Sequence, residues 1–236
     1  MSESPATALI NWVPETRFGT WFQSHWMWTD YVLKPACDDL VRLIAGDGRR
    51  YPKILDGGCG AGHAFARLAK EFDPEQIIGI EIDPDAVTAA ELRGIDCERP
   101  VSVVHGSVEH ISMDDASIDM IFCHQTIHHV VDPQRTVGEF FRILKPGGVL
   151  LVSESCQKFI SSLMVRALFR HPVRVPHSAQ DFLELLRNGG FAVSEDMISY
   201  PNPFWTYADF GLLAKLGIGN IQMTTKRLLN CIAIKE

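Results

Sequence analysis

The sequence predicts an α/β fold, namely a doubly wound sheet of seven strands, mostly parallel with an antiparallel last strand, preceded by an N-terminal helical lid. From residue 53 onward, short apolar runs alternate with stretches of helical period, as in a parallel sheet covered on both faces. A glycine-rich loop joins the first apolar run to the first of these helical stretches. The 236 residues suffice for one full-sized core, so we expect a main domain at 51–236 behind a lid at 1–50.

The strands and helices are expected in alternation. Asp83-Pro84 and Asp132-Pro133 each place a capping carboxylate before a proline that suits the first helical turn. Ser178 and Asp181 form a capping-box pattern that predicts a helix at 178–188. An aromatic- and proline-bearing cap excursion is expected at about 200–225, because this segment is too long for a hairpin turn. The expected strands are 53–56, 76–81, 101–105, 118–123, 149–153, 191–199 and 226–234.

Charge and cysteine content narrow the functional classes. Twenty-two basic against 29 acidic residues give a net charge of −7, unlike the basic domains that bind nucleic acids, so no nucleic-acid partner is expected. The six cysteines occur singly, without metal-ligand spacing, so we expect reduced thiols and no bound metal. No signal-peptide pattern begins the chain and no 18 apolar residues run together, so we expect a cytoplasmic protein.

The most specific motif is the glycine loop, Asp56-Gly57-Gly58-Cys59-Gly60-Ala61-Gly62, between a strand and a helix. Glycines let the backbone approach a ligand, and the helix N-terminus offers N–H groups to a carboxylate or phosphate. A dinucleotide fingerprint would need a third glycine where His63 stands. The loop therefore disfavours a nicotinamide cofactor.

As an acidic-x-Gly-x-Gly-x-Gly pattern, the loop resembles that of class I S-adenosylmethionine (SAM)-dependent methyltransferases, which have a Rossmann-like fold. Further matches follow in order: Glu81 after the second strand, 106–109 after the third, and 114–121 and 144–150 before the fourth and fifth. The resemblance is greatest to the small-molecule branch with the ubiquinone- and menaquinone-type enzymes. It implies SAM as the cofactor, with contacts from Asp56, Gly57, Gly58, Cys59, Gly60, Gly62, Glu81, Ile82, Ser107, Val108, His124 and Gln125.

The residue types suit that cofactor. Asp56 and the loop carbonyls can meet the ammonium group of the amino-acid tail, while helix N–H groups meet its carboxylate. Glu81 stands at the end of the second strand, 23 residues beyond Gly58, where its carboxylate can take both ribose hydroxyls.

The acceptor is expected near the segment after the fourth strand. His124 or His128 can serve there as a general base, because an imidazole titrates near neutrality, and one of them can instead pack the loop. The Asn/Asp-Pro-Pro-aromatic signature of nucleobase or glutamine methylation is missing at this position, and the similar 202–205 is expected to be a turn. O- or C-methylation is therefore preferred to N-methylation.

Aromatic residues before the first strand predict one wall of the acceptor pocket, suited to a planar or apolar acceptor. The stretch 155–180 contains no Asp or Glu but several basic residues, among them Arg170 and Arg174. It can bind an anionic group of the acceptor, rest on a membrane surface, or be a solvated face, and we prefer the first. The expected acceptor-binding residues are Trp21, His25, Trp28, His128, Arg170 and Trp205.

The sequence thus favours a SAM-dependent methyltransferase that acts on a small aromatic or apolar acceptor, which can carry an anionic group. A nicotinamide-dependent oxidoreductase and a non-catalytic SAM-binding domain remain as alternatives. The sequence names neither the acceptor nor the oligomeric state.

Overall fold

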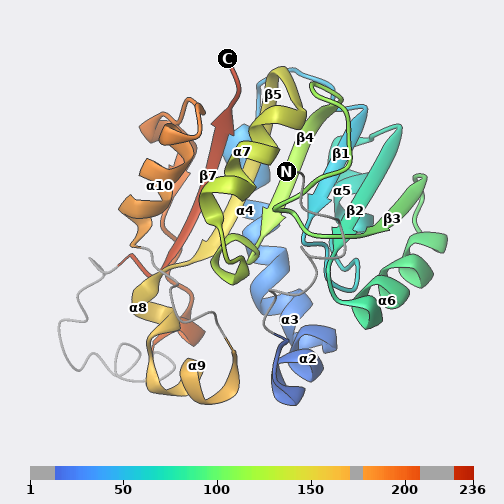
Figure 1. The fold of residues 1–236 in the computed structure, drawn as a ribbon. Helices are drawn as coiled ribbons and strands as arrows, with labels where there is room; N and C mark the ends of the chain where they lie inside the picture. Colours follow the sequence, from blue (N-terminus) through green and yellow to red (C-terminus); the bar gives the residue numbers. More distant parts are fainter. Residues whose placement is uncertain (1–13, 171–177, 208–225) are drawn as a thin grey trace, which may run out of the picture.

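The computed structural model describes residues 14–170, 178–207 and 226–236, and Figure 1 shows their arrangement. Its centre is one seven-stranded sheet in the order β3-β2-β1-β4-β5-β7-β6. The strands β1 to β5 pair in parallel, while β7 runs antiparallel to β5 and to β6. This confirms the expected mostly parallel sheet. The strand bounds are β1 Lys53–Gly57, β2 Gln76–Glu81, β3 Val101–His105, β4 Ile118–His124, β5 Leu144–Ser155, β6 Ile198–Ser199 and β7 Leu228–Ile234.

Helices cover both faces of the sheet (Figure 1). One buried cluster joins the sheet to α7 and α10, and a second joins its other face to α4, α5 and α6. The helices of these layers are α4 Lys34–Ile44, α5 Phe65–Phe72, α6 Pro84–Ile95, α7 Pro133–Ile143 and α10 Ala179–Asn188. Shorter helices lie at the end of the molecule where the parallel strands finish: α2 Arg17–Ser24, α3 Trp26–Trp28, α8 Gln157–Ile160 and α9 Leu163–Leu168.

The capping signals act as expected. The Asp83 carboxylate accepts a hydrogen bond from the backbone N–H of Asp85, and Asp132 accepts one from Arg135, so α6 and α7 begin at their prolines. Ser178 and Asp181 form the full capping box of α10. A five-residue π-helical turn, Thr29–Leu33, joins α3 to α4.

The strand expected at 191–199 is shorter in the structure. Only a single bridge at Ala192 and the two-residue strand β6 remain, separated by a 3₁₀ turn at Glu195–Met197. Ser194, Glu195 and Asp196 are exposed polar residues, which favour a turn over a strand of the sheet. The part of the cap excursion at 208–225 lies outside the described residues, while 204–206 forms a 3₁₀ turn.

The topology places the site. Strands β1 to β4 are parallel neighbours, so the glycine loop, Glu81, Ser107 and His124 all come to the carboxyl edge of the sheet. Among the helices of the described residues, none is long and apolar enough to cross a bilayer.

Candidate functional site

The glycine loop folds back onto the end of β2. The backbone N–H groups of Gly58 and Cys59 donate to the Ile80 carbonyl at 2.9 and 3.0 Å. Gly58 has φ +79°, and a Cβ there would lie 2.4 Å from the Thr126 Oγ1. Gly60 has φ +52°, but a Cβ at that position would meet nothing within 4 Å. The loop therefore packs closely at Gly58 and leaves free space at Gly60.

Glu81 holds the loop in this shape. Its Oε2 accepts from the Gly60 N–H at 2.8 Å, and its Oε1 accepts from Ile82 and Asp83 at 2.8 and 2.9 Å. Burial raises the pKa of the Glu81 carboxyl, and these three N–H groups act in the opposite direction. The carboxylate expected to meet the ribose is thus fixed in position by the backbone around it.

Asp56 ends β1 as a buried carboxyl, only 2% exposed. Its Oδ2 has no hydrogen-bond partner among the described residues. Burial, with a smaller contribution from the Glu81 charge, raises the pKa of Asp56 to about 8. A buried carboxyl with a free oxygen, beside a loop with open space, suits the ammonium group of an amino-acid tail. The residues present thus fit S-adenosylmethionine.

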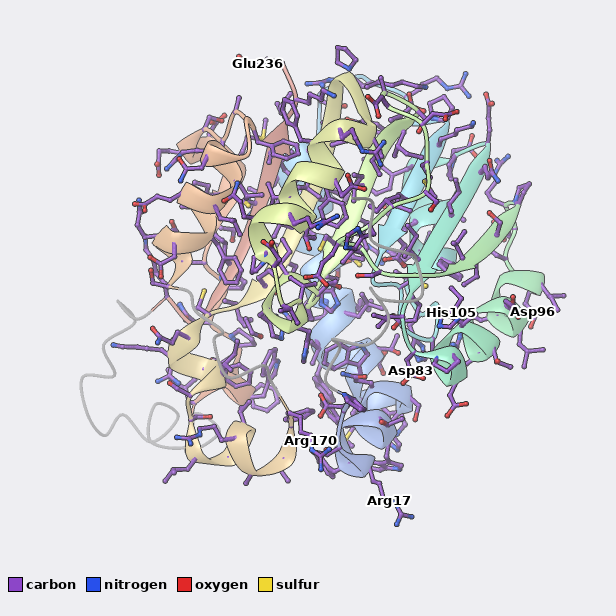
Figure 2. All side chains as sticks on the ribbon, viewed as in Figure 1. Arg17, Asp83, Asp96, His105, Arg170 and Glu236 are labelled. Carbon is purple, nitrogen blue, oxygen red and sulfur yellow. The ribbon has the colours of Figure 1, made fainter. Side chains whose placement is uncertain are left out.

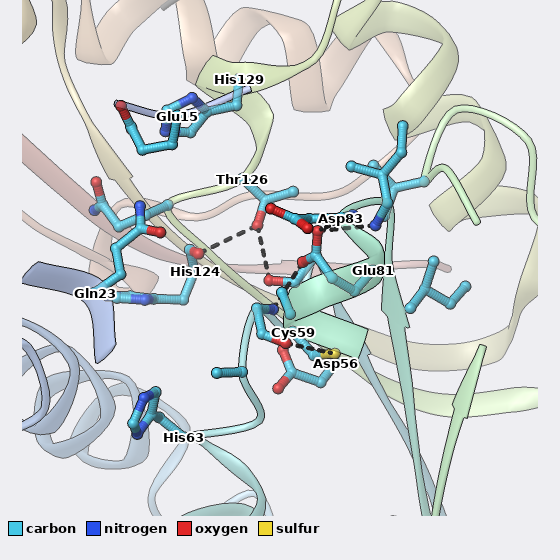
Figure 3. Close-up of a pocket in the computed structure, with 18 of the residues that line it drawn as sticks. Glu15, Gln23, Asp56, Cys59, His63, Glu81, Asp83, His124, Thr126 and His129 are labelled. Atoms are coloured by element: carbon cyan, nitrogen blue, oxygen red, sulfur yellow. Dashed lines mark hydrogen bonds between the residues drawn. The ribbon is translucent and has the colours of Figure 1, made fainter. Parts of the chain in front are cut away.

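The loop and strand ends surround a cavity of about 420 Å³ (Figure 3). The glycine loop and the ends of β2 and β3 form one part of its wall, and the segment after β4 forms another. Side chains from α2 and the residues beside it close the remaining side. Of the expected cofactor contacts, the wall contains Asp56, Gly58, Cys59, Gly60, Glu81, Ile82, Ser107, Val108, His124 and Gln125.

Two expected cofactor contacts, Gly57 and Gly62, lie outside this wall. A Cβ on Gly57 would come within 2.9 Å of the Phe140 ring, and one on Gly62 within 2.5 Å of the Phe65 ring. Both glycines therefore make room for the side chains of neighbouring helices.

The two candidate histidines have different surroundings. His128 is 3% exposed, lies outside the cavity wall, and its Nδ1 is 2.5 Å from the Oε2 of the fully buried Glu154. The other oxygen of Glu154 accepts from the N–H groups of Thr126 and Ile127 at 2.9 and 2.7 Å. Glu154 and His128 therefore fasten the loop after β4 to β5.

His124 lines the cavity itself. It is 9% exposed, and its Nε2 has no hydrogen-bond partner among the described residues. Burial lowers the pKa of His124 to about 3, so the imidazole is uncharged at neutral pH. Its ring stacks with that of Phe122 and makes an edge contact with Trp28, whose ring centroid is 5.6 Å away.

Among the expected acceptor-binding residues, Trp28 lies on the cavity wall, whereas Trp21, His25, Arg170 and Trp205 do not. Trp21 is 48% exposed, and the His25 Nδ1 accepts from the Met27 N–H. The Trp205 indole donates to the Tyr31 carbonyl at 2.9 Å. Arg170 is exposed at the α2 and α9 end of the molecule (Figure 2), and Arg174 lies outside the described residues.

Several wall residues were not predicted as site residues from the sequence, among them Glu15, Gln23 and Thr126. Glu15 and Gln23 stand in the aromatic N-terminal segment, where the rings dominated the pattern and no spacing marked the polar residues. Thr126 lies in the segment that contained the candidate histidines, and it packs against Gly58. Within the described ranges, no group of three His, Cys, Asp or Glu residues is arranged to hold a metal ion.

Comparison with known proteins agrees with this geometry. The family model described as a methyltransferase domain matches residues 55–152. A probable S-adenosylmethionine-dependent methyltransferase of Mycolicibacterium smegmatis is 32% identical over 145 residues, which cover 61% of this chain and 53% of that protein. Phosphoethanolamine N-methyltransferase 1 of Arabidopsis thaliana is 30% identical over 152 residues, which cover 61% of this chain and 30% of that protein. The chain thus spans about half or less of these relatives.

The fold is also shared with solved structures. The S-adenosylmethionine-dependent methyltransferase of Mesorhizobium loti superimposes with a TM-score of 0.62 at 16% identity, over 84% of this chain and 97% of that one. The family match begins inside β1 and ends inside β5, and so it contains Asp56, the glycine loop, Glu81 and His124. Residues 55–152 are therefore a class I methyltransferase domain, whose cofactor is S-adenosylmethionine.

Proposed function

We propose that this protein transfers a methyl group from S-adenosylmethionine to a small-molecule acceptor. One observation carries the proposal: the wall of the cavity beside the glycine loop continues past the strand ends to Gln23 and Trp28, which are not expected cofactor contacts, and so offers space beyond those contacts. That space favours an enzyme over a domain that only binds SAM. We also propose that residues 1–50 form a lid over the acceptor and that the protein is cytoplasmic.

Bound S-adenosylmethionine supplies an electrophilic methyl group on a positively charged sulfur. Asp56 would hold the ammonium group, and Glu81, fixed by three N–H groups, would hold the ribose hydroxyls. The α2 segment and Trp28 would exclude water and orient the acceptor, since alignment is the main contribution that an enzyme makes to such a displacement. The uncharged His124 would hold a hydrogen bond at Nε2, because a pKa lowered to about 3 makes its imidazole a weak base.

The residues of the cavity wall indicate part of the chemistry of the acceptor. A planar or apolar acceptor can lie against Trp28, as the aromatic lid predicted. Phosphoethanolamine, the acceptor in the name of the Arabidopsis relative, contains a phosphate, and no lysine or arginine occurs among the described wall residues. We therefore do not propose phosphoethanolamine or another anionic acceptor, and O- or C-methylation remains part of the proposal.

Isothermal titration tests the cofactor half of this proposal. We expect S-adenosylhomocysteine to bind with micromolar affinity and NADH not to bind. The opposite pattern would establish the nicotinamide alternative. Transfer of label from methyl-labelled SAM to a panel of small acceptors tests the catalytic half, and cofactor binding without transfer to any acceptor would favour the non-catalytic alternative.

A further inference from the structure

The cavity wall contains six acidic residues and, among its described residues, no lysine or arginine. Burial lowers the pKa of His63 to about 4 and of His124 to about 3, so neither imidazole is charged at pH 7. A wall of this kind repels anions and attracts cations. The acidic wall residues are Glu15, Asp56, Glu81, Asp83, Asp85 and Glu109.

Glu15 differs from the other five carboxylates by its place in the fold. The others end or follow β1, β2 and β3, where the cofactor contacts are expected, whereas Glu15 precedes α2 on the opposite part of the wall. Figure 3 draws it beside His129 and away from Glu81. Glu15 therefore belongs to the part of the cavity that the cofactor contacts leave free.

The Glu15 side chain is held in place and still has an oxygen to offer. Its Oε1 accepts from the backbone N–H groups of Thr16 and Arg170, at 2.7 and 2.8 Å. Its Oε2 accepts no hydrogen bond from the described residues. One oxygen thus fixes the side chain between the start of α2 and the segment after α9, and the other can meet a ligand without further ordering of the side chain.

A second observation points to a ligand in the same space. The His124 Nε2 is buried without a partner on this wall, and a buried polar nitrogen costs free energy until something bonds to it. Trp28 lies against the same imidazole with ring centroids 5.6 Å apart. A carboxylate, an aromatic ring and an unpartnered imidazole together suit an organic cation with an additional polar atom.

We propose that the acceptor is a small cationic molecule, such as an amine that is protonated at neutral pH, with its positive group paired to Glu15 beside Trp28. This inference rests on the proposed methyl transfer and specifies the acceptor of that same cavity. Glu15 would then determine specificity by its charge.

The test uses the full chain saturated with S-adenosylhomocysteine and probes matched in shape. One set consists of tyramine, 4-ethylphenol and 3-(4-hydroxyphenyl)propionate, and the other of butylamine, butanol and butyrate. Thermal shift and isothermal titration are measured on the wild type, on Glu15→Gln and on Asp30→Asn. The glutamine keeps an oxygen for the Thr16 and Arg170 N–H groups. Asp30 is an exposed carboxylate of the same N-terminal segment that lies off the cavity wall.

We expect only the amines to bind the wild type, and Glu15→Gln to weaken that binding at least about tenfold. The Asp30→Asn variant should stay within about threefold of the wild type, because it removes a charge outside the cavity. Equal or tighter binding of the neutral or anionic probes, unchanged amine affinity in Glu15→Gln, or no amine binding would each overturn the inference. The proposed function predicts that the wild type binds S-adenosylhomocysteine whatever the acceptor is. If the wild type binds S-adenosylhomocysteine but the probes behave otherwise than expected, only the cationic acceptor is refuted, and if it does not bind S-adenosylhomocysteine, the proposed function itself fails.

Discussion

The buried Asp56 carboxyl predicts that cofactor binding releases a proton near neutral pH. Its pKa of about 8 leaves it about nine-tenths protonated at pH 7 when the cavity holds no cation. An ammonium group beside it favours the carboxylate and returns the pKa toward 3.8, so binding should release about 0.9 proton at pH 7 and about 0.1 at pH 9. Asp56→Asn cannot release this proton.

The assay is titration with S-adenosylhomocysteine in buffers of different ionisation enthalpy, because the slope of the observed heat against that enthalpy counts the protons. The difference between the slopes of the wild type and of Asp56→Asn gives the protons that Asp56 alone releases, because the contributions of other titrating groups, such as Glu81, are common to both proteins. Equal slopes for the two proteins at pH 7 would refute the assignment of Asp56 to the ammonium group.

The same pKa sets a pH dependence of stability. The folded state keeps a proton on Asp56 that the unfolded state loses above its ordinary pKa of 3.8, so stability falls as pH rises toward about 8. For the cofactor-free protein this amounts to about 3 kcal/mol between pH 5 and pH 7. Urea denaturation should show that fall in the wild type and a smaller one in Asp56→Asn, and equal falls would count against the raised pKa.

Three further substitutions test the site. Glu81→Ala should weaken S-adenosylhomocysteine binding at least about tenfold. It should also lower the melting temperature, because three backbone N–H groups lose their acceptor. A titration that finds normal affinity would exclude Glu81 from the cofactor site. Gly60→Val should abolish S-adenosylhomocysteine binding, because its side chain would enter the open space of the cavity. Gly48 also has a positive φ and open space around it but lies off the cavity wall, so Gly48→Val should lower only stability. Equal affinities for S-adenosylhomocysteine in the two variants would contradict this. Glu154→Ala should lower the free energy of unfolding by about 3 kcal/mol or more, since it removes from the interior the carboxylate that faces His128 and accepts from two backbone N–H groups. Chemical denaturation with a loss below about 1 kcal/mol would show that the loop after β4 is held by other contacts.

Local patterns in the sequence determined most of the sheet and the cofactor half of the site. The strands β1 to β5 and the starts of α6, α7 and α10 follow from apolar runs and capping residues that act within a few positions of the chain. The glycine loop and Glu81 could be placed because each directly follows or ends an apolar run, and the parallel pairing of β1 with β2 then brings the two strand ends together. The prediction of one continuous strand at 191–199 was wrong, because the exposed polar residues in its middle form a turn.

The acceptor half of the site was decided by tertiary structure. Thr16 donates to the Leu168 carbonyl, and Glu15 accepts from Arg170, so contacts more than 150 positions apart set how the lid lies. Sequence composition showed that aromatic and basic residues gather in these segments, but not which ones face the cavity. Trp28 and Glu15 face the cavity while Trp21 and Arg170 lie at the surface, because the orientation of a short amphipathic helix depends on the partner against which it packs.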